Sequence, residues 1–284
     1  MAQDKSLDEV FERLVLMTEK HGADDNGLWD DTETLIWELR NKSEIVIDRD
    51  KISNFSSIID ELRLVADRHR NSLDEFNAIT QNAPKVSYCV QSKYMHRGCY
   101  CPSPMLDLLI DNVRRGKSAE KLPKAKKGYY KYYFDASGIL VTAEKYDPSI
   151  SAESPHEIEH IIREEAVEYG LTFVKTDPPS IMYLSKACYE NDLIKSYAAC
   201  LYNEHTPKAM WELHYEEYSY SGARLMKADV YFGISPHFNS YDMNECSFKY
   251  DDSGKIYEFD VMRQFQGKPT STTYCHHNFR PHGD

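Results

Sequence analysis

The 284-residue chain has few glycines, no long apolar run and no phosphate-binding motif. None of its apolar stretches approaches the roughly 20 residues that cross a bilayer as a helix, so no membrane insertion is expected. Its 12 glycines do not form G-x-x-x-x-G-K-[ST] or G-x-G-x-x-G, which argues against the common nucleotide-binding loops. The nucleophile motif G-x-S-x-G is absent as well. The sequence therefore contains no nucleotide-binding or nucleophile motif that would favour one class of enzyme.

Basic side chains are fewer than acidic ones in this sequence. Lysine and arginine total 34 against 46 acidic side chains, and the formal net charge is −12. An acidic surface repels nucleic acid and attracts basic partners. The first residues also lack the basic-then-apolar order of a secretory signal, and the seven cysteines are an odd number. We therefore expect a cytoplasmic protein with free thiols that binds another protein, with no nucleic acid or membrane partner.

The first part of the chain has helical patterns. Ser6-Leu7-Asp8-Glu9 is a capping box at the start of an apolar repeat, and a second helix is expected after Asp31. A longer apolar stripe at helical spacing runs from Phe55 to Ile79. Ser103-Pro104 then predicts a helix that ends before Gly116. We predict a helical domain over residues 1–116, followed by a lysine-rich linker over residues 117–128.

From residue 129 the pattern alternates as in β-strands. An aromatic residue, two spacers and Ser-Gly occur three times, at residues 134–138, 218–222 and 250–254. Each copy predicts a β-hairpin whose type I turn ends in a glycine with positive φ. A glycine-free turn, Glu190-Asn191-Asp192, divides two further strand patterns. The prediction for residues 129–284 is an antiparallel sheet of successive β-hairpins with one helix.

That interrupting helix is predicted over residues 154–169. Pro155 and Glu157 suit the first turn of a helix, and apolar residues recur from Ile158 at helical spacing. The fold class predicted for the whole chain is therefore α+β, with a helical N-terminal part followed by the antiparallel sheet.

The same segment contains the zinc-protease pattern H-E-x-x-H. His156 and His160 would bind the metal from one face of a helix, and Glu157 would be the general base. Against this alternative, both histidines would lie opposite the apolar stripe of the predicted helix. A zinc-dependent hydrolase is therefore the alternative function, and no cofactor is expected otherwise.

A second set of possible metal ligands consists of thiols and imidazoles. Cys89, His96, Cys99 and Cys101 lie close together in the sequence, and Cys275-His276-His277 lies near the C-terminus. The C-x-C spacing of Cys99 and Cys101 differs from that of common zinc knuckles. Buried free thiols are the favoured interpretation.

Tyrosine is concentrated in the hairpin part of the chain. Because neighbouring residues of a strand point to opposite faces, these tyrosines cannot all be buried on one side. We predict an acidic, tyrosine-rich binding surface, since tyrosine is enriched at protein interfaces. Its predicted residues are Tyr130, Tyr132, Glu212, Glu216, Tyr218 and Tyr220.

The three hairpin copies, together with the acidic charge, resemble the immunity proteins of bacterial polymorphic-toxin systems. The resemblance covers residues 129–265 at most, and the same hairpin text also resembles the YD-type repeats of the toxin shells. It implies that the protein binds and neutralises a cognate, basic toxin domain in the bacterial cytoplasm. Electrostatic attraction would accelerate that association.

Overall fold

The computed structural model describes residues 48–90, 97–105, 117–122, 128–151, 154–174, 176, 179–202, 213–235, 240–265 and 268–275. The two helices expected before residue 48 lie outside these ranges, as does the one expected after Pro104 except for Met105.

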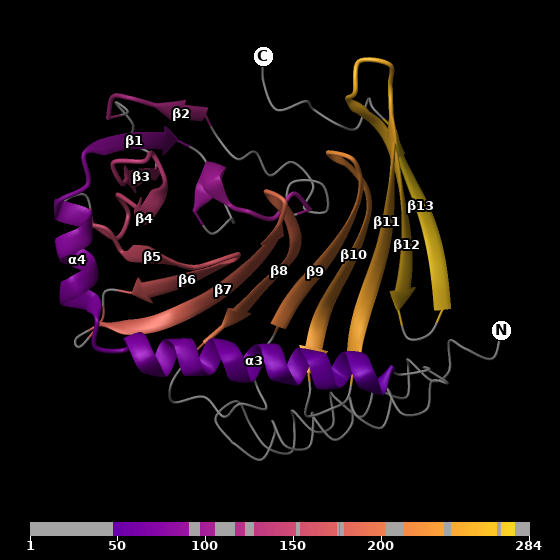
Figure 1. The fold of residues 1–284 in the computed structure, drawn as a ribbon, viewed down its shortest axis with the longest axis horizontal. Coiled ribbons are helices and arrows are strands. Elements are labelled where there is room, and N and C mark those ends of the chain that lie inside the picture. Colours follow the sequence, from indigo (N-terminus) through magenta and orange to yellow (C-terminus); the bar gives the residue numbers. More distant parts are fainter. Residues whose placement is uncertain are drawn as a thin grey trace, which may run out of the picture.

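Thirteen strands of the described residues form one antiparallel sheet. From β3 to β13 each strand pairs with the next one along the chain, while β1 pairs with both β2 and β3. The strands are β1 (Lys85–Val90), β2 (Lys117–Ala119), β3 (Tyr129–Phe134), β4 (Leu140–Tyr146), β5 (Glu157–Glu164), β6 (Val167–Val174), β7 (Ser180–Glu190), β8 (Leu193–Leu201), β9 (Leu213–Ser221), β10 (Arg224–Ser235), β11 (Ser240–Tyr250), β12 (Ile256–Phe265) and β13 (Lys268–Cys275). Figure 1 shows this sheet curving into a U that is open at the top of the view.

In the described part of the chain, two α-helices lie on the outside of the U and a short 3-10 helix lies between its arms (Figure 1). They are α3 (Arg49–His69), α4 (Leu73–Gln81) and η1 (Gly98–Tyr100). Asp48 caps α3, because its carboxylate accepts the backbone N–H of Asp50 at 3.0 Å. The predicted apolar stripe is confirmed in α3, where Phe55, Ile59 and Leu62 are buried against the sheet. The single long helix expected to Ile79 is wrong, because α3 ends at His69 and Ile79 of the separate helix α4 is exposed. Neither helix of the described residues has the length and apolar character needed to span a membrane.

The two faces of the sheet have different partners. Along β6, Tyr169, Leu171 and Phe173 belong to the apolar core that includes α3. Glu168 alternates with them and points to the other face, where it contacts Arg97. We call these the outer face, covered by α3 and α4, and the inner face, which contacts residues 97–105.

The predicted fold class, an α+β chain with a helical N-terminal part and one helix within the sheet, is wrong. Strand β1 lies in the part expected to be helical, and it pairs with β3 along its whole length. Residues 154–169, expected to be a helix, instead contain all of β5 and the start of β6. The proposed division into domains at residues 117–128 stays a prediction.

Burial of both faces explains the wrong helix prediction. His160 of β5 is buried on the outer face, whereas Glu159 and Ile161 are buried on the inner face. Apolar residues therefore occur at both odd and even positions, which removes the period-two signal of a half-exposed strand. Ile158, Ile161 and Ile162 then match helical spacing without forming a helix.

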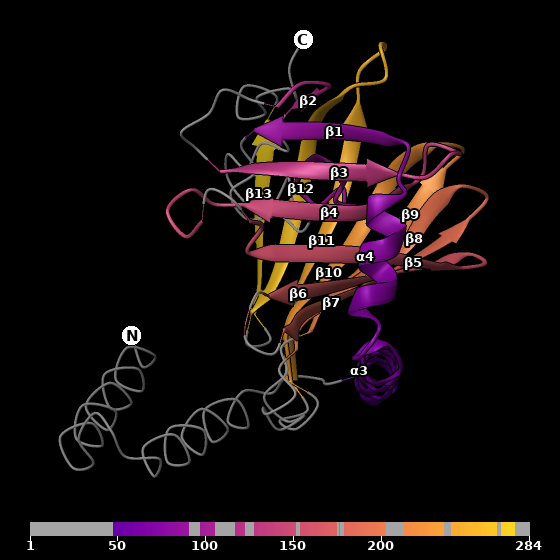
Figure 2. The same ribbon diagram turned by 90° about the vertical axis from the view of Figure 1, so that its left-hand side faces the viewer.

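The order of the strands brings five tight turns to one rim of the sheet. Because neighbours are antiparallel, β3, β5, β7, β9 and β11 all point to the same side. The arrow of β3 points to this rim in Figure 2, opposite to β1 and β4. All three Ser-Gly turns lie here, together with the β5–β6 and β7–β8 turns. We call this edge the turn rim.

The three Ser-Gly turns are not identical. Gly138, Gly222 and Gly254 all have positive φ, at 79°, 60° and 81°. In the first and third copies an aspartate caps the turn: Ser137 N–H donates to Asp135, and Lys255 N–H donates to Asp251. In the second copy Ser221 pairs directly with Arg224, which leaves a two-residue turn with glycine at its first position. The expected three-residue loop is therefore wrong for that copy.

Candidate functional site

A buried arginine holds the 97–105 segment against the inner face. Arg97 is 3% exposed, and its Nε lies 2.6 Å from Glu159 Oε1 of β5. The same guanidinium pairs with Glu168 of β6 and donates to Ser185 Oγ of β7 at 3.1 Å. Three neighbouring strands are therefore linked to one side chain. Desolvation opposes the charge of Arg97, but attraction to Glu159 and Glu168 raises its pKa.

Two glycines make room for this arrangement. Arg97 and Gly98 both have positive φ, at 60° and 54°, which turns the chain into the inner face. Gly170 faces the guanidinium, and a Cβ there would come closer than 3.0 Å to atoms of Arg97, Glu159 and Ser185. A glycine inside a strand permits this close approach.

The carboxylate of Glu168 connects this network to a pocket at the turn rim. Glu168 also pairs with Arg163 of β5, and Arg163 Nη1 donates to the carbonyl oxygen of Leu140 at 2.7 Å. Although burial alone would raise the pKa of Glu168, attraction to Arg97 and Arg163 lowers it. The four side chains Arg97, Arg163, Glu159 and Glu168 therefore have no net charge when ionised.

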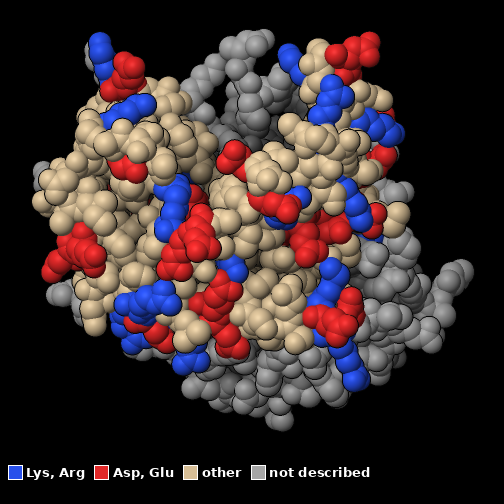
Figure 3. Space-filling view, in the orientation of Figure 1, with Lys and Arg blue, Asp and Glu red and all other residues tan. Residues whose placement is uncertain are grey.

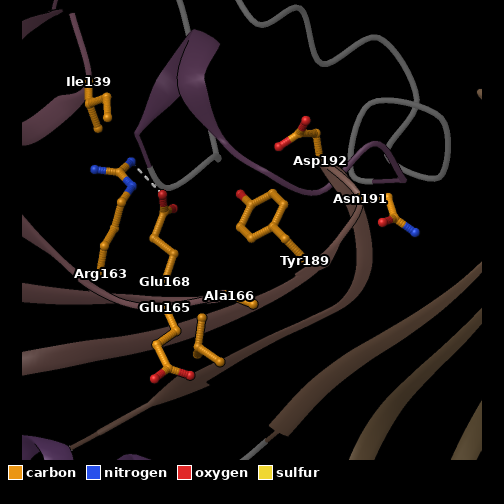
Figure 4. Close-up of a pocket in the computed structure, with 9 residues that line it drawn as sticks. Ile139, Arg163, Glu165, Ala166, Glu168, Tyr189, Asn191 and Asp192 are labelled. Carbon is orange, nitrogen blue, oxygen red and sulfur yellow. Dashed lines mark hydrogen bonds and ion pairs between the residues drawn. The ribbon is translucent and has the colours of Figure 1, made fainter. Parts of the chain in front are cut away.

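The pocket has a volume of about 590 Å³, within the range of ligand sites. It lies where the β3–β4, β5–β6 and β7–β8 turns meet. Figure 4 shows Arg163 and Glu168 on one side of the space, with Tyr189 and Asp192 across from them. Ile139 borders it as an exposed apolar side chain. The lining residues are Ile139, Arg163, Glu165, Ala166, Val167, Glu168, Tyr189, Asn191 and Asp192.

A second buried carboxylate lies farther along the inner face. Glu216 is fully buried, and both of its oxygens lie within 2.9 Å of Ser103 Oγ. It also bonds to the Tyr218 hydroxyl and His214 Nε2. Here the carboxylate lies between the hydroxyl and the imidazole, whereas a nucleophilic triad needs the imidazole in the middle. The arrangement supports a structural role in anchoring Ser103.

Most of the predicted partner-binding residues are in the core. Tyr130, Tyr132, Glu216 and Tyr218 are at most 6% exposed, and Tyr220 is half-buried. Glu212 lies outside the described residues. Buried side chains cannot meet a partner while the fold stays closed, so an interface has to use other residues. One face of the sheet was expected to present these residues to a partner, but that face is covered, and the tyrosines belong to or pack against buried clusters.

The H-E-x-x-H segment does not form a helical metal site. In an extended strand, residues four apart are separated by about 13 Å, so His156 and His160 cannot bind one ion together. His160 stacks on Phe76 of α4 with ring centroids 4.7 Å apart, and burial lowers its pKa to about 4. Glu157 pairs with Lys145 at 2.7 Å. Among the described residues, no group of three or more His, Cys, Asp or Glu side chains is arranged to hold a metal.

The structure describes only some of the cysteines and histidines that were considered as zinc ligands. Cys89 of β1 is buried beside Cys99 of η1, and the hydrogen bond between the two thiols and burial both raise the pKa of Cys89. Cys101 is also buried. His96, His276 and His277 lie outside the described residues, so the structure does not test the alternative of zinc binding by the whole set.

Sequence reasoning missed Arg97 and Gly170. The partners of Arg97 lie 62, 71 and 88 residues away along the chain, so no local pattern connects them. Gly170 does carry a signal, because a lone glycine within an apolar strand marks a close approach of another group. Comparison with known proteins adds no further assignment: no protein-family model and no curated protein matches the chain.

Proposed function

We propose that the protein binds a basic protein partner at the turn rim. The resemblance to immunity proteins suggests neutralisation of a cognate toxin domain in the bacterial cytoplasm as the biological form of this binding. One observation carries the proposal: the antiparallel strand order places several acidic turns along one edge of the sheet. Only the tertiary arrangement brings these turns together, since they are spread over residues 135–255.

The turn residues themselves are strongly acidic. Figure 3, which looks onto this rim, shows groups of Asp and Glu with Lys and Arg among them. Within the turns, five carboxylates accompany one lysine. They are Asp135, Glu165, Asp192, Asp251 and Asp252, against Lys255. Such a field attracts a basic surface and accelerates its association.

The turns also form a rigid surface. Asp135 and Asp251 accept backbone N–H groups within their own turns, so these carboxylates are held in place. The strands behind them are paired in ladders, with one register shift each in the β7–β8 and β11–β12 pairs. A rigid binding surface loses little conformational entropy on association, which favours affinity. This supports a pre-formed interface.

The test measures binding of the full-length chain to purified basic domains encoded beside its gene. We expect at least one of them to bind, with an association rate that falls steeply as salt is raised. Removal of two rim charges by Glu190→Gln and Asp252→Asn should lower the association rate several-fold at low salt.

The matched control removes two charges from the helices, by Asp60→Asn and Glu75→Gln. Both residues are exposed on the helices of the outer face and belong to none of the five turns. The control should leave the association rate within about twofold of the unmodified chain. No binding to any such domain, or equal losses in the rim and control variants, would contradict the proposal.

A further inference from the structure

We propose that the pocket between the β3–β4, β5–β6 and β7–β8 turns receives an arginine side chain of the partner. The inference rests on the proposed function for the source of that side chain, but the pocket can be tested without a partner. Charged side chains, an aromatic ring and an apolar side chain border this one space.

The first step is the charge balance. Of the four carboxylates at the β5–β6 and β7–β8 turns, Glu164 pairs with Arg68 at 3.1 Å and Glu190 pairs with Lys195 at 2.9 Å. Glu165 and Asp192 have no cationic partner among the described residues. The ionised network around Arg97 and Arg163 is neutral, so these two carboxylates leave the pocket with a net negative charge.

The second step is geometry. Figure 4 shows the Asp192 carboxylate and the Tyr189 ring facing the same space, whereas the Glu165 carboxylate turns away from it. Asp192 is therefore the anchor for a bound cation, and Glu165 adds to the field at the mouth. Arg163 does not repel such a cation strongly, because Glu168 already neutralises it.

The third step is the choice of cation. A guanidinium pairs with a carboxylate in a planar, two-bond geometry and stacks on aromatic rings. Asp192 offers the carboxylate, half-buried Tyr189 offers the ring, and Ile139, which is 42% exposed, suits the aliphatic stem. An ammonium group would use only the first of these features fully. The combination favours arginine.

The fourth step concerns the backbone of the turns. Non-glycine residues with positive φ occur at four described positions, namely Arg97, Glu165, Asn191 and Asp192. Three of them line this pocket, and Arg97 binds Glu168, which lines it as well. The left-handed conformation at Asn191 and Asp192 suits their residue types. It places Asp192 at the mouth, so an Asp192→Asn variant can keep the same turn.

The probes are N-acetyl-arginine amide and N-acetyl-citrulline amide, which have nearly the same shape but differ in charge. Each is titrated into the isotope-labelled full-length chain, and amide chemical shifts are followed by NMR. We expect saturable shifts at Tyr189, Asn191 and Asp192 with the arginine amide and at least tenfold weaker binding of the citrulline amide. Asp192→Asn should reduce arginine binding to the citrulline level.

Asp252→Asn is the matched control, because it removes one exposed rim carboxylate outside the pocket. It should bind the arginine amide within twofold of the unmodified chain. Equal binding of the two amides, unchanged binding by Asp192→Asn, or shifts located elsewhere would overturn the inference. Arginine binding without any basic protein partner would instead contradict only the proposed function. A partner that binds Asp192→Asn normally would overturn only the pocket inference.

Discussion

Arg97 and Glu159 form a buried ion pair with 2.6 Å between Nε and Oε1, although 62 residues separate them in the sequence. The pair attaches the 97–105 segment to strand β5, and Glu168 extends it toward the pocket at the turn rim. Glu168 thus connects the buried Arg97 network on the inner face to the edge that we propose as the binding surface.

Replacing Arg97 with methionine should lower the free energy of unfolding by about 3–5 kcal/mol, because Glu159 would be left as a buried charge without its partner. Urea denaturation of the purified chain measures this change. Arg68→Met is the matched control, since the Arg68–Glu164 pair is exposed on both sides. That control should cost less than about 1 kcal/mol. Similar losses in the two variants would show that the buried network is not special.

Gly170→Ala should destabilise the protein by about 2 kcal/mol or more, because the new methyl group would collide with Arg97, Glu159 and Ser185. Gly138→Ala serves for comparison, as its Cβ would point into open space and only its φ of 79° would be unfavourable. It should cost about 1 kcal/mol. Denaturation midpoints measured in parallel decide the order, and a Gly170→Ala variant as stable as the unmodified chain would be inconsistent with the close approach.

The stability of the fold should fall as the pH is lowered from 7 to 4. Burial lowers the pKa of His160 from 6.5 to about 4, so the unfolded chain binds this proton more readily than the folded one. Protonation of His160 therefore favours the unfolded state between pH 7 and pH 4. It lowers the free energy of unfolding by about 3 kcal/mol at pH 4.

The hydrogen bonds of His160 fit a neutral imidazole. Thr80 donates to the Phe76 carbonyl, so Thr142 can donate to Thr80 at 2.8 Å and accept from Nδ1 of His160 at 3.1 Å. In His160→Asn the dependence of unfolding free energy on pH between 4 and 6.5 should be flatter. Equal slopes for the two proteins, measured by denaturation at several pH values, would rule out this assignment.

Glu165→Gly should stabilise the protein by about 1 kcal/mol, because Glu165 has a φ of 54° at the first position of the β5–β6 turn. Thermal unfolding should show a midpoint raised by about 2 °C. Ala166→Gly is the control, since Ala166 is not among the residues with positive φ. It should be neutral or destabilising, and a Glu165→Gly variant of lower stability would argue that the Glu165 side chain makes a stabilising contact.

Local patterns in the sequence were sufficient for several elements. The stripe that contains Phe55, Ile59 and Leu62 predicted α3, and the turn at Asn191-Asp192 was placed correctly between β7 and β8. The glycines of the three Ser-Gly turns have the expected positive φ. These features depend on contacts within a few residues, so the sequence determines them before any tertiary packing.

Tertiary structure decided the remainder. Strand β5 matched helical spacing because both of its faces are buried, with α4 packed on the outer face and Arg97 on the inner face. Tyr132 and Tyr218, expected at a surface, are core residues because the curved sheet encloses residues 97–105. The acidic rim exists only because the antiparallel order aligns turns that are far apart in the sequence. The sequence by itself determined the turns, the acidic charge and α3, whereas long-range pairing decided which side chains lie together.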